Sequence, residues 1–259
     1  MFSYVYKDLD IAHKFDVAPV LSSDYAKHYH DYYEIYFFVK GNVFYTVEGE
    51  RRQLKPGDIL LISPGEHHFV SLIDKTPYER YVLKFQDNLV PDFLKDSFMK
   101  RSAFYSTGEK YFPLFEKLDA LYETYYPMEL QLLFSGIITE LLINLNHSAF
   151  HEKTQNADNH ITSIIQYINE NIRRPITMDD LCKEFHFSQS HLYKEFHKHM
   201  KIPVMTYIRS KKIIAAHQLI YRGAKPTKIA ESFGFMEYST FYRAYISVIG
   251  FPPGQFKQK

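Results

Sequence analysis

The feature that most constrains the fold of this chain is an internal repeat near its C-terminal end. Three apolar positions recur 48 residues later, where Leu181, Phe185 and Phe187 match Ile229, Phe233 and Phe235. Further along the offset is 49 residues, where Leu192, Tyr193 and Phe196 match Phe241, Tyr242 and Tyr245, and Ile202, Pro203 and Tyr207 match Phe251, Pro252 and Phe256. A constant offset with one inserted residue predicts two copies of one supersecondary unit.

Each copy is predicted to be a short helix, a tight turn and a second helix. In the first copy we expect Thr177 to cap the first helix and Ser188 to cap the second, with the turn at His186. In the second copy we expect Thr227 to cap the first helix and Gly234 to supply the positive φ of the turn. A helix–turn–helix with polar and basic residues on its second helix is typical of proteins that read the major groove of DNA.

The charge distribution agrees with a polyanionic partner for the repeat region. Residues 1–158 carry 16 Lys and Arg against 23 Asp and Glu, a net charge of −7. Residues 159–259 carry 15 against 7, a net charge of +8. Such asymmetry favours an acidic module joined to a module that binds nucleic acid.

The first ninety residues have strand character. Short aromatic or β-branched runs at 34–39, 43–48, 58–63 and 78–85 are separated by turn signals that contain Gly41, Gly49 and Gly57. Evenly spaced short strands predict an antiparallel barrel or sandwich. From about residue 112 the apolar period changes to three and four, which predicts two helices over 113–147. The polar stretch 150–160 is the candidate linker.

The composition indicates the cellular compartment in which the protein is expected. Cys182 is the single cysteine, so no disulfide framework is expected and a reducing environment is favoured. No apolar run approaches the roughly 20 residues that span a bilayer, and the N-terminus lacks a signal-peptide pattern. We therefore expect a soluble cytoplasmic protein without a membrane partner.

Residues 160–258 resemble the DNA-binding domain of the AraC/XylS family of regulators. The resemblance rests on LCKEFHFSQSHLYKEFHKH from Leu181, and on IAESFGFMEYSTFYRAYISVIGFPPGQFK from Ile229. It departs from the family pattern at Cys182, Lys201 and Lys212. The resemblance implies one linking helix over about 204–220 and a base-reading side made of polar residues on both second helices. These residues are Gln189, Ser190, Tyr193, Lys194, Tyr238, Ser239, Tyr242 and Arg243.

The N-terminal residues resemble the two motifs of a cupin barrel, the barrel of sugar-sensing members of the same family. The first motif contains His28, His30 and Glu34, and the second runs from Gly57 to His68. A period of two would place His28, His30, Glu34 and Tyr36 on one inward face of a strand. The expected ligand-binding residues are therefore His28, His30, Glu34, Tyr36 and His68.

Metal-dependent cupins hold a divalent cation with the three His and the Glu of this set. Here Ser22 and Leu72 stand where the motifs have Gly and Asn. We therefore favour a polar ligand without a metal and expect no cofactor, while a divalent metal at His28, His30, Glu34 and His68 stays as the alternative.

The sequence thus predicts a two-domain protein. Residues 1–149 would form a cupin-like (jelly-roll-like) antiparallel β-barrel with a helical dimerisation segment from about 112, and residues 161–259 an all-α DNA-binding domain with two helix-turn-helix units. The predicted function is a homodimeric regulator of transcription that binds double-stranded DNA under the control of a small effector, a carbohydrate, and that has no catalytic residues. The alternative from another class is a metal-dependent cupin enzyme with an accessory nucleic-acid-binding module.

Overall fold

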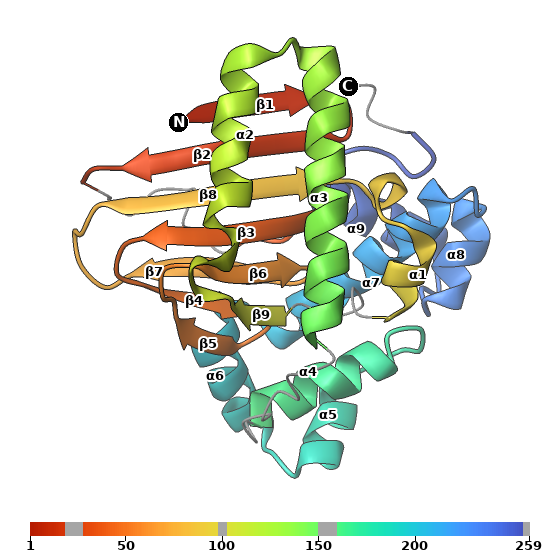
Figure 1. The fold of residues 1–259 in the computed structure, drawn as a ribbon. Helices are drawn as coiled ribbons and strands as arrows, with labels where there is room; N and C mark the ends of the chain where they lie inside the picture. The colour runs from red at the N-terminus through yellow and green to blue at the C-terminus, as the bar shows by residue number, and fades with distance from the viewer. Residues whose placement is uncertain (19–27, 98–102, 150–159, 256–259) are drawn as a thin grey trace.

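The computed structural model describes residues 1–18, 28–97, 103–149 and 160–255. A sheet-rich N-terminal part is followed by a helical C-terminal part (Figure 1). The six-stranded antiparallel sheet has the order β1-β2-β8-β3-β6-β9, and a three-stranded antiparallel sheet has the order β5-β4-β7. The strands are β1 (Phe2–Tyr6), β2 (Leu9–Asp16), β3 (Tyr33–Lys40), β4 (Val43–Val47), β5 (Glu50–Gln53), β6 (Asp58–Ile62), β7 (His68–Leu72), β8 (Tyr78–Phe85) and β9 (Ala103–Ser106).

The two sheets confirm the expected antiparallel, jelly-roll-like class, but within the described residues they form two separate hydrogen-bonded sheets and no closed barrel. The four predicted strands appear as β3, β4, β6 and β8. The predicted turn at Gly49 is tight, because Glu48 and Gly49 both have positive φ, at 49° and 82°.

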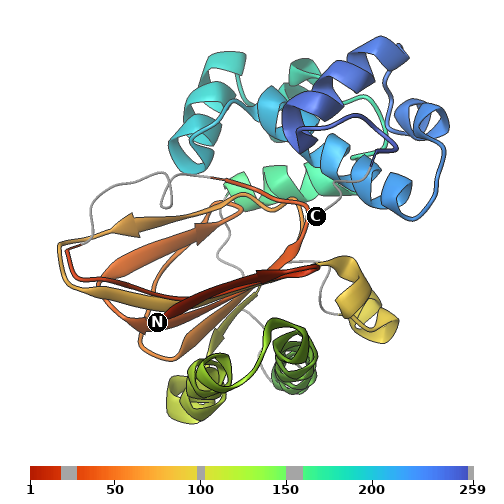
Figure 2. The same cartoon turned by 90° about the horizontal axis from the view of Figure 1, so that it is seen from above.

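The six-stranded sheet buries both of its faces. On β8, Tyr81, Leu83 and Phe85 belong to a core shared with the helices α2 (Phe112–Thr124) and α3 (Pro127–Ala149). The alternate residues Tyr78 and Val82 face the three-stranded sheet in a second core. This period-two division gives each sheet face its own partner. Figure 2 shows α2 and α3 on one side of the sheets and the C-terminal helices on the other.

Helix α3 begins at Pro127, as the sequence predicts for a first-turn proline. Among the described residues it is the one helix whose length and composition would allow it to cross a membrane. Its side chains Leu130, Phe134, Ile138 and Leu141 are buried in the core with the six-stranded sheet. The short helix α1 (Asp92–Ser97) and the 3₁₀ turns η2 (Asp87–Leu89) and η3 (Gly108–Tyr111) complete this part.

The C-terminal part contains both predicted helix-turn-helix units. After α4 (His160–Glu170), the first unit consists of α5 (Met178–Phe185) and α6 (Gln189–Met200), and the second of α8 (Pro226–Ser232) and α9 (Tyr238–Ile249). The single helix α7 (Val204–Tyr221) joins them, in agreement with the predicted linking helix at 204–220. Buried residues of α7 contribute to the apolar cores of both units. The predicted linker at 150–160 falls almost entirely outside the described residues.

The turns and caps follow local chemistry. Both turns use a left-handed residue, His186 at φ 55° and Gly234 at φ 73°. Thr177 forms a capping box with Asp180, and the Ser188 hydroxyl accepts a hydrogen bond from the His191 backbone nitrogen. The predicted cap at Thr227 is wrong, because α8 begins at Pro226 and Lys225 occupies the cap position. A proline in the first turn starts the helix one residue ahead of the threonine.

Candidate ligand pocket and DNA-reading surface

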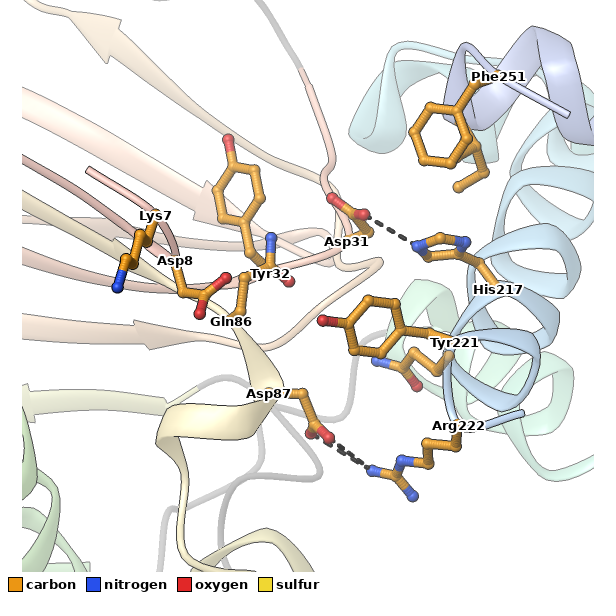
Figure 3. Close-up of a pocket in the computed structure, with 12 residues that line it drawn as sticks. Lys7, Asp8, Asp31, Tyr32, Gln86, Asp87, His217, Tyr221, Arg222 and Phe251 are labelled. Carbon is orange, nitrogen blue, oxygen red and sulfur yellow. Dashed lines mark hydrogen bonds and ion pairs between the residues drawn. The ribbon is translucent and has the colours of Figure 1, made fainter. Parts of the chain in front are cut away.

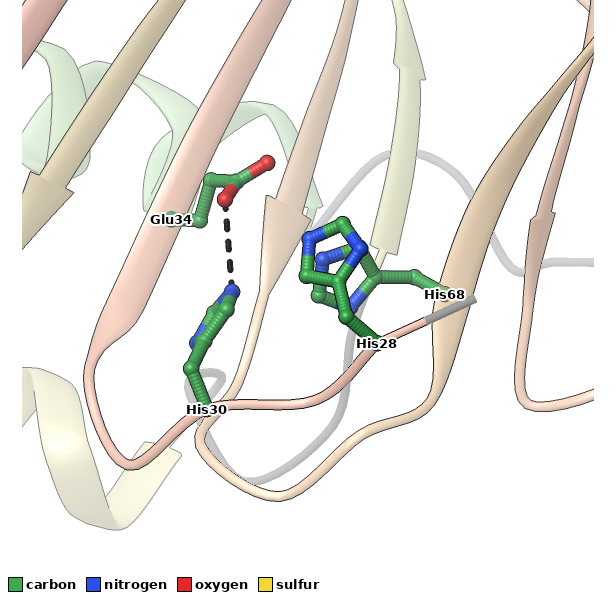
Figure 4. A group of neighbouring side chains, drawn as sticks. All are labelled: His28, His30, Glu34 and His68. Atoms are coloured by element: carbon green, nitrogen blue, oxygen red, sulfur yellow. Dashed lines mark ion pairs between the residues drawn. The ribbon is translucent and has the colours of Figure 1, made fainter. Parts of the chain in front are cut away.

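Four of the predicted ligand residues converge on one point between the sheets. One ligand atom from each of His28, His30, Glu34 and His68 lies within 4.8 Å of all the others (Figure 4). The prediction that one strand presents them by period-two spacing is wrong in detail, since β3 begins at Tyr33. His28 instead forms an isolated bridge to His68, with backbone N–O distances of 3.2 and 3.1 Å. This bridge and β3 bring the two motifs together.

Backbone carbonyl groups orient two of the imidazole rings. His30 Nδ1 lies 2.8 Å from the Tyr32 carbonyl oxygen, and His68 Nδ1 lies 2.9 Å from that of Glu66. A carbonyl oxygen can only accept, so each Nδ1 carries the proton and each Nε2 directs a lone pair into the cluster. His30 Nε2 then lies 3.2 Å from the Glu34 carboxylate. Two opposed lone pairs at this distance favour a cation between them.

Electrostatics set the protonation states of the cluster. Burial alone would raise the pKa of Glu34, but its interactions with His30 and with the neighbouring basic side chains lower it to about 2. Burial lowers the pKa of His68 to about 3, because the protonated ring loses its hydration. At neutral pH Glu34 is therefore an anion and His68 is neutral, which are the states that accept hydrogen bonds or coordinate a metal.

A cavity of about 240 Å³ extends from this cluster between the two sheets. The predicted residues His28, Glu34 and Tyr36 line it, whereas His30 and His68 lie in the cluster but outside the lining. The other lining residues, which were not predicted, are Lys14, Tyr45, Val70, Tyr78, Arg80, Val82 and Lys84. Four of these residues could have been predicted from the strand at 78–85. Because side chains alternate along a strand, Tyr78, Arg80, Val82 and Lys84 share one face.

Three tyrosines and one arginine make the cavity wall rigid. Tyr36 and Tyr78 share a short hydrogen bond between their hydroxyl groups, and the Tyr36 ring lies 4.8 Å from that of Tyr45. The Arg80 guanidinium lies 4.2 Å from the centre of the Tyr78 ring and forms an ion pair with Asp16. The wall therefore combines aromatic faces with fixed hydrogen-bond donors, which is common in sites for small polar ligands.

A second cavity of about 530 Å³ lies where the sheets meet α7 (Figure 3). It was not predicted, because its wall combines residues from both ends of the chain. Asp31 forms an ion pair with His217 at 3.1 Å, and Asp87 pairs with Arg222 at 3.1 Å. These two pairs bridge the sheet-rich and helical parts on the wall of this cavity.

The predicted DNA-reading residues lie on α6 and α9, and all eight are exposed. Their helices turn the opposite faces inward, with Leu192 and Phe196 buried on α6 and Phe241 and Tyr245 buried on α9. Gln189 donates a hydrogen bond to Asp179 at 2.8 Å, and Ser239 donates one to Glu237 at 3.2 Å. The rings of Tyr193, Tyr238 and Tyr242 contact neighbouring rings on their own helices. The exposed set forms two polar helix faces, one per unit.

Comparison with known proteins agrees with this arrangement. The family model of the AraC-like ligand-binding domain matches residues 21–161, and that of a helix-turn-helix domain matches residues 181–259. Together the two facing sheets and the paired helix-turn-helix units define a transcription regulator with a ligand-binding domain. The chain belongs to the AraC family of transcription regulators.

Two curated relatives cover most of the chain. An uncharacterised helix-turn-helix transcriptional regulator of Bacillus subtilis, YbfI, is 24% identical over 83% of this chain and 80% of its own length. The Msm operon regulatory protein of Streptococcus mutans is 22% identical over 88% and 85%. Among solved structures, ToxT from Vibrio cholerae is 16% identical and aligns over 96% of each chain with a TM-score of 0.39. The two curated relatives are regulators of transcription or of an operon by description.

Proposed function

We propose that the effector of this regulator is a carbohydrate bound in the cavity between the two sheets. The observation that carries the proposal is the combination of the Tyr36, Tyr45 and Tyr78 rings with the polar groups of Glu34 and Arg80. Aromatic faces pack against the C–H faces of a sugar, while fixed donors and acceptors bond its hydroxyl groups. The volume of about 240 Å³ lies just below the range of roughly 300–1,000 Å³ for small-molecule sites, which favours a monosaccharide.

A thermal-shift screen of aldoses, ketoses and sugar phosphates tests this proposal. A sugar that binds only the native state stabilises it by about 2.7 kcal/mol at a hundredfold excess over its Kd, which raises the Tm by several degrees. We expect Glu34→Ala and His30→Ala to remove the shift, because both side chains belong to the cluster. His197→Ala, at an exposed position on α6, should retain it. A shift that survives in both folded cluster variants would place the effector elsewhere, with the cavity at Asp87 and Arg222 as the next site to test.

We propose a divalent first-row metal ion as the second candidate for the cluster. Three imidazoles and a carboxylate within 4.8 Å form a suitable ligand set, and the carbonyl partners of His30 and His68 leave Nε2 available. Protein incubated with Zn²⁺ or Mn²⁺ and then gel-filtered should retain about one ion per chain. His68→Ala should lose that ion and His197→Ala should keep it. Equal metal content in these two variants would contradict the assignment.

We propose that the eight exposed residues on α6 and α9 contact operator DNA. Arg and Lys side chains suit guanine, Gln suits adenine, and Tyr suits a thymine methyl group or a phosphate. The exposed side chains of Ser188, Lys198, Arg209 and Lys228 are candidates for phosphate contacts, although Ser188 also caps α6. The net charge of +8 in residues 159–259 supports binding that weakens steeply as salt rises.

We further propose a homodimer formed through α3. One face of this helix packs on the sheet, while Met128, Leu132 and Ile143 on another face are exposed. Gly136 lies in the same exposed stripe, and a Cβ atom built there would meet nothing within 4 Å. Exposed apolar residues around a small residue suit a symmetric helix-to-helix contact between two copies.

A further inference from the structure

The segments that carry the ligand cluster also touch the helical part. Neighbouring residues in each segment face opposite ways. His68 lies in the cluster, whereas His67 is buried against α7, where its Nε2 lies 3.4 Å from the Ser210 hydroxyl. His30 lies in the cluster, whereas Asp31 forms the ion pair with His217 of α7 at 3.1 Å (Figures 3 and 4). His67 thus faces away from the cluster and toward α7.

The segment that contains His67 and His68 connects the cluster to α6. The His67 backbone nitrogen donates to Glu48 at 2.6 Å, and Glu48 also accepts a short hydrogen bond from the Tyr207 hydroxyl. The Tyr207 ring lies 4.9 Å from that of His67 and 5.4 Å from that of Phe196 on the buried face of α6. A continuous set of contacts therefore runs from His68 to the reading helix of the first unit.

The segment that contains His30 and Asp31 connects the cluster to α9. His217 uses both ring nitrogens, since Nε2 pairs with Asp31 and Nδ1 lies 2.5 Å from the Tyr245 hydroxyl. Tyr245 is fully buried on the inner face of α9, opposite the predicted reading residues. A second set of contacts thus runs from His30 to the reading helix of the second unit.

At two glycines, the backbone of the sheet-rich part packs closely against the helical part. A Cβ atom at Gly49 would lie 3.0 Å from Ile161 of α4 and 3.3 Å from the Met200 sulfur of α6. A Cβ atom at Gly65 would lie 3.0 Å from Ile214 of α7. Close-packed surfaces of this kind transmit small displacements instead of absorbing them.

From these contacts, and resting on the proposed effector function, we propose that the cluster is coupled to the two reading helices by separate routes. Route one runs through His68, His67, Glu48 and Tyr207 to α6. Route two runs through His30, Asp31, His217 and Tyr245 to α9. An effector that displaces the two histidines then changes both units, and each route contributes its own coupling free energy.

Amide hydrogen exchange on the intact protein, without effector, tests the two routes. His68→Ala perturbs the cluster end of route one and should speed exchange in α6, while His30→Ala should speed exchange in α9. One hydrogen bond corresponds to roughly a two- to tenfold change in a local opening equilibrium, so we expect effects of that size. His68→Gln and His30→Gln are the alternative variants if an alanine variant fails to fold.

Two matched variants that each lack one tyrosine hydroxyl group then interrupt one route each. Tyr207→Phe and Tyr245→Phe both keep a buried ring and remove only its hydrogen bond. In the Tyr207→Phe background, His68→Ala should lose at least about half of its effect on α6, whereas in the Tyr245→Phe background the effect should persist. The reverse pattern is expected for His30→Ala and α9.

The proposal is overturned if the cluster variants leave both helices unchanged, if each deletion alters α6 and α9 alike, or if the couplings survive in both backgrounds. Because the experiment contains no sugar, its outcome is independent of the thermal-shift screen. The routes can therefore fail while a carbohydrate effector stands, and the reverse also holds.

Discussion

At the scale of single residues, Lys212 shows how one buried cation joins three segments of the helical part. Its ammonium group donates to the Arg174 carbonyl oxygen at 2.7 Å and to the Phe233 carbonyl oxygen at 2.8 Å. Burial lowers the pKa of Lys212, yet the two carbonyl groups replace part of the lost hydration. The side chain thereby ties α7 to the loop before α5 and to the end of α8. This departure from the family pattern lies inside the fold and away from the exposed faces of α6 and α9.

Arg243 is the residue at which base reading can be separated from simple charge attraction. It is exposed on α9, and Phe241 and Tyr245 on the same helix point into the core. A bidentate contact with guanine contributes about 1–3 kcal/mol of base discrimination. We expect Arg243→Ala to weaken binding to a duplex selected by the wild-type protein and to flatten the preference at one base pair. Binding measured across single-base variants of that duplex gives the result.

Lys198→Ala supplies the matched control for Arg243→Ala. Lys198 is exposed at the C-terminal end of α6, 3.9 Å from Glu195, and is a candidate phosphate contact. Its removal should weaken all sequences alike and lower the salt slope by about one. If Arg243→Ala behaves in the same way, with equal loss for every base at every position, Arg243 contacts only the DNA backbone.

At the scale of elements, the turns of the two helix-turn-helix units both need a residue in the left-handed conformation, and they use different residues for it. Histidine adopts the left-handed conformation at His186, where the turn is exposed. At Gly234 a Cβ atom would lie 3.0 Å from both the ring and the backbone nitrogen of Pro175. The second turn packs against the loop that precedes α5, so it requires glycine for space as well as for conformation.

Gly234→Ala should therefore destabilise the protein more than Gly223→Ala does. Both positions have positive φ, at 73° and 95°, so both variants incur the left-handed penalty of about 1–2 kcal/mol. Only Gly234 adds a steric clash, since a Cβ atom at Gly223 meets nothing within 4 Å. Overpacking of this kind costs typically about 1–3 kcal/mol more. Thermal unfolding followed by circular dichroism measures the difference, and equal Tm losses would show that the loop at Pro175 yields without cost.

At the scale of the whole molecule, the sheets lie between two helical layers. Helices α2 and α3 cover one side, and α4 to α9 lie on the other (Figure 2). The exposed stripe on α3 therefore lies far from the reading helices, and a dimer formed there would leave α6 and α9 of both copies accessible. A symmetric pair of DNA-binding parts suits an operator with repeated half-sites.

Leu132→Lys tests this dimer. Leu132 is 76% exposed at the middle of the stripe, so a charge there should cost little in the folded monomer but would be desolvated in a symmetric contact. We expect dimer affinity to fall at least about tenfold, which corresponds to about 1.4 kcal/mol. Sedimentation equilibrium measures it, with Glu123→Lys on the exposed side of α2 as the control. Unchanged association in Leu132→Lys would exclude this face as the interface.

Much of the fold could be predicted because it repeats locally. The 48- and 49-residue offsets identified both helix-turn-helix units, and apolar periods identified β3, β4, β6, β8, α2 and α3. The histidine motifs predicted the cluster even though the expected strand geometry was wrong. Strand β5, with the sequence ERRQ, has no apolar alternation that could predict it. It is a strand because it pairs with β4.

By itself, the sequence determined the residues that carry periodicity or a motif, because a helix, a strand or a turn is specified by neighbours a few residues apart. Only the tertiary structure decided which of these surfaces meet. Glu48 and Tyr207 are 159 residues apart, and Asp31 and His217 come from segments that are even farther apart in the sequence. No local pattern encodes such pairs, since their partners are set by the shape and packing of two completed cores.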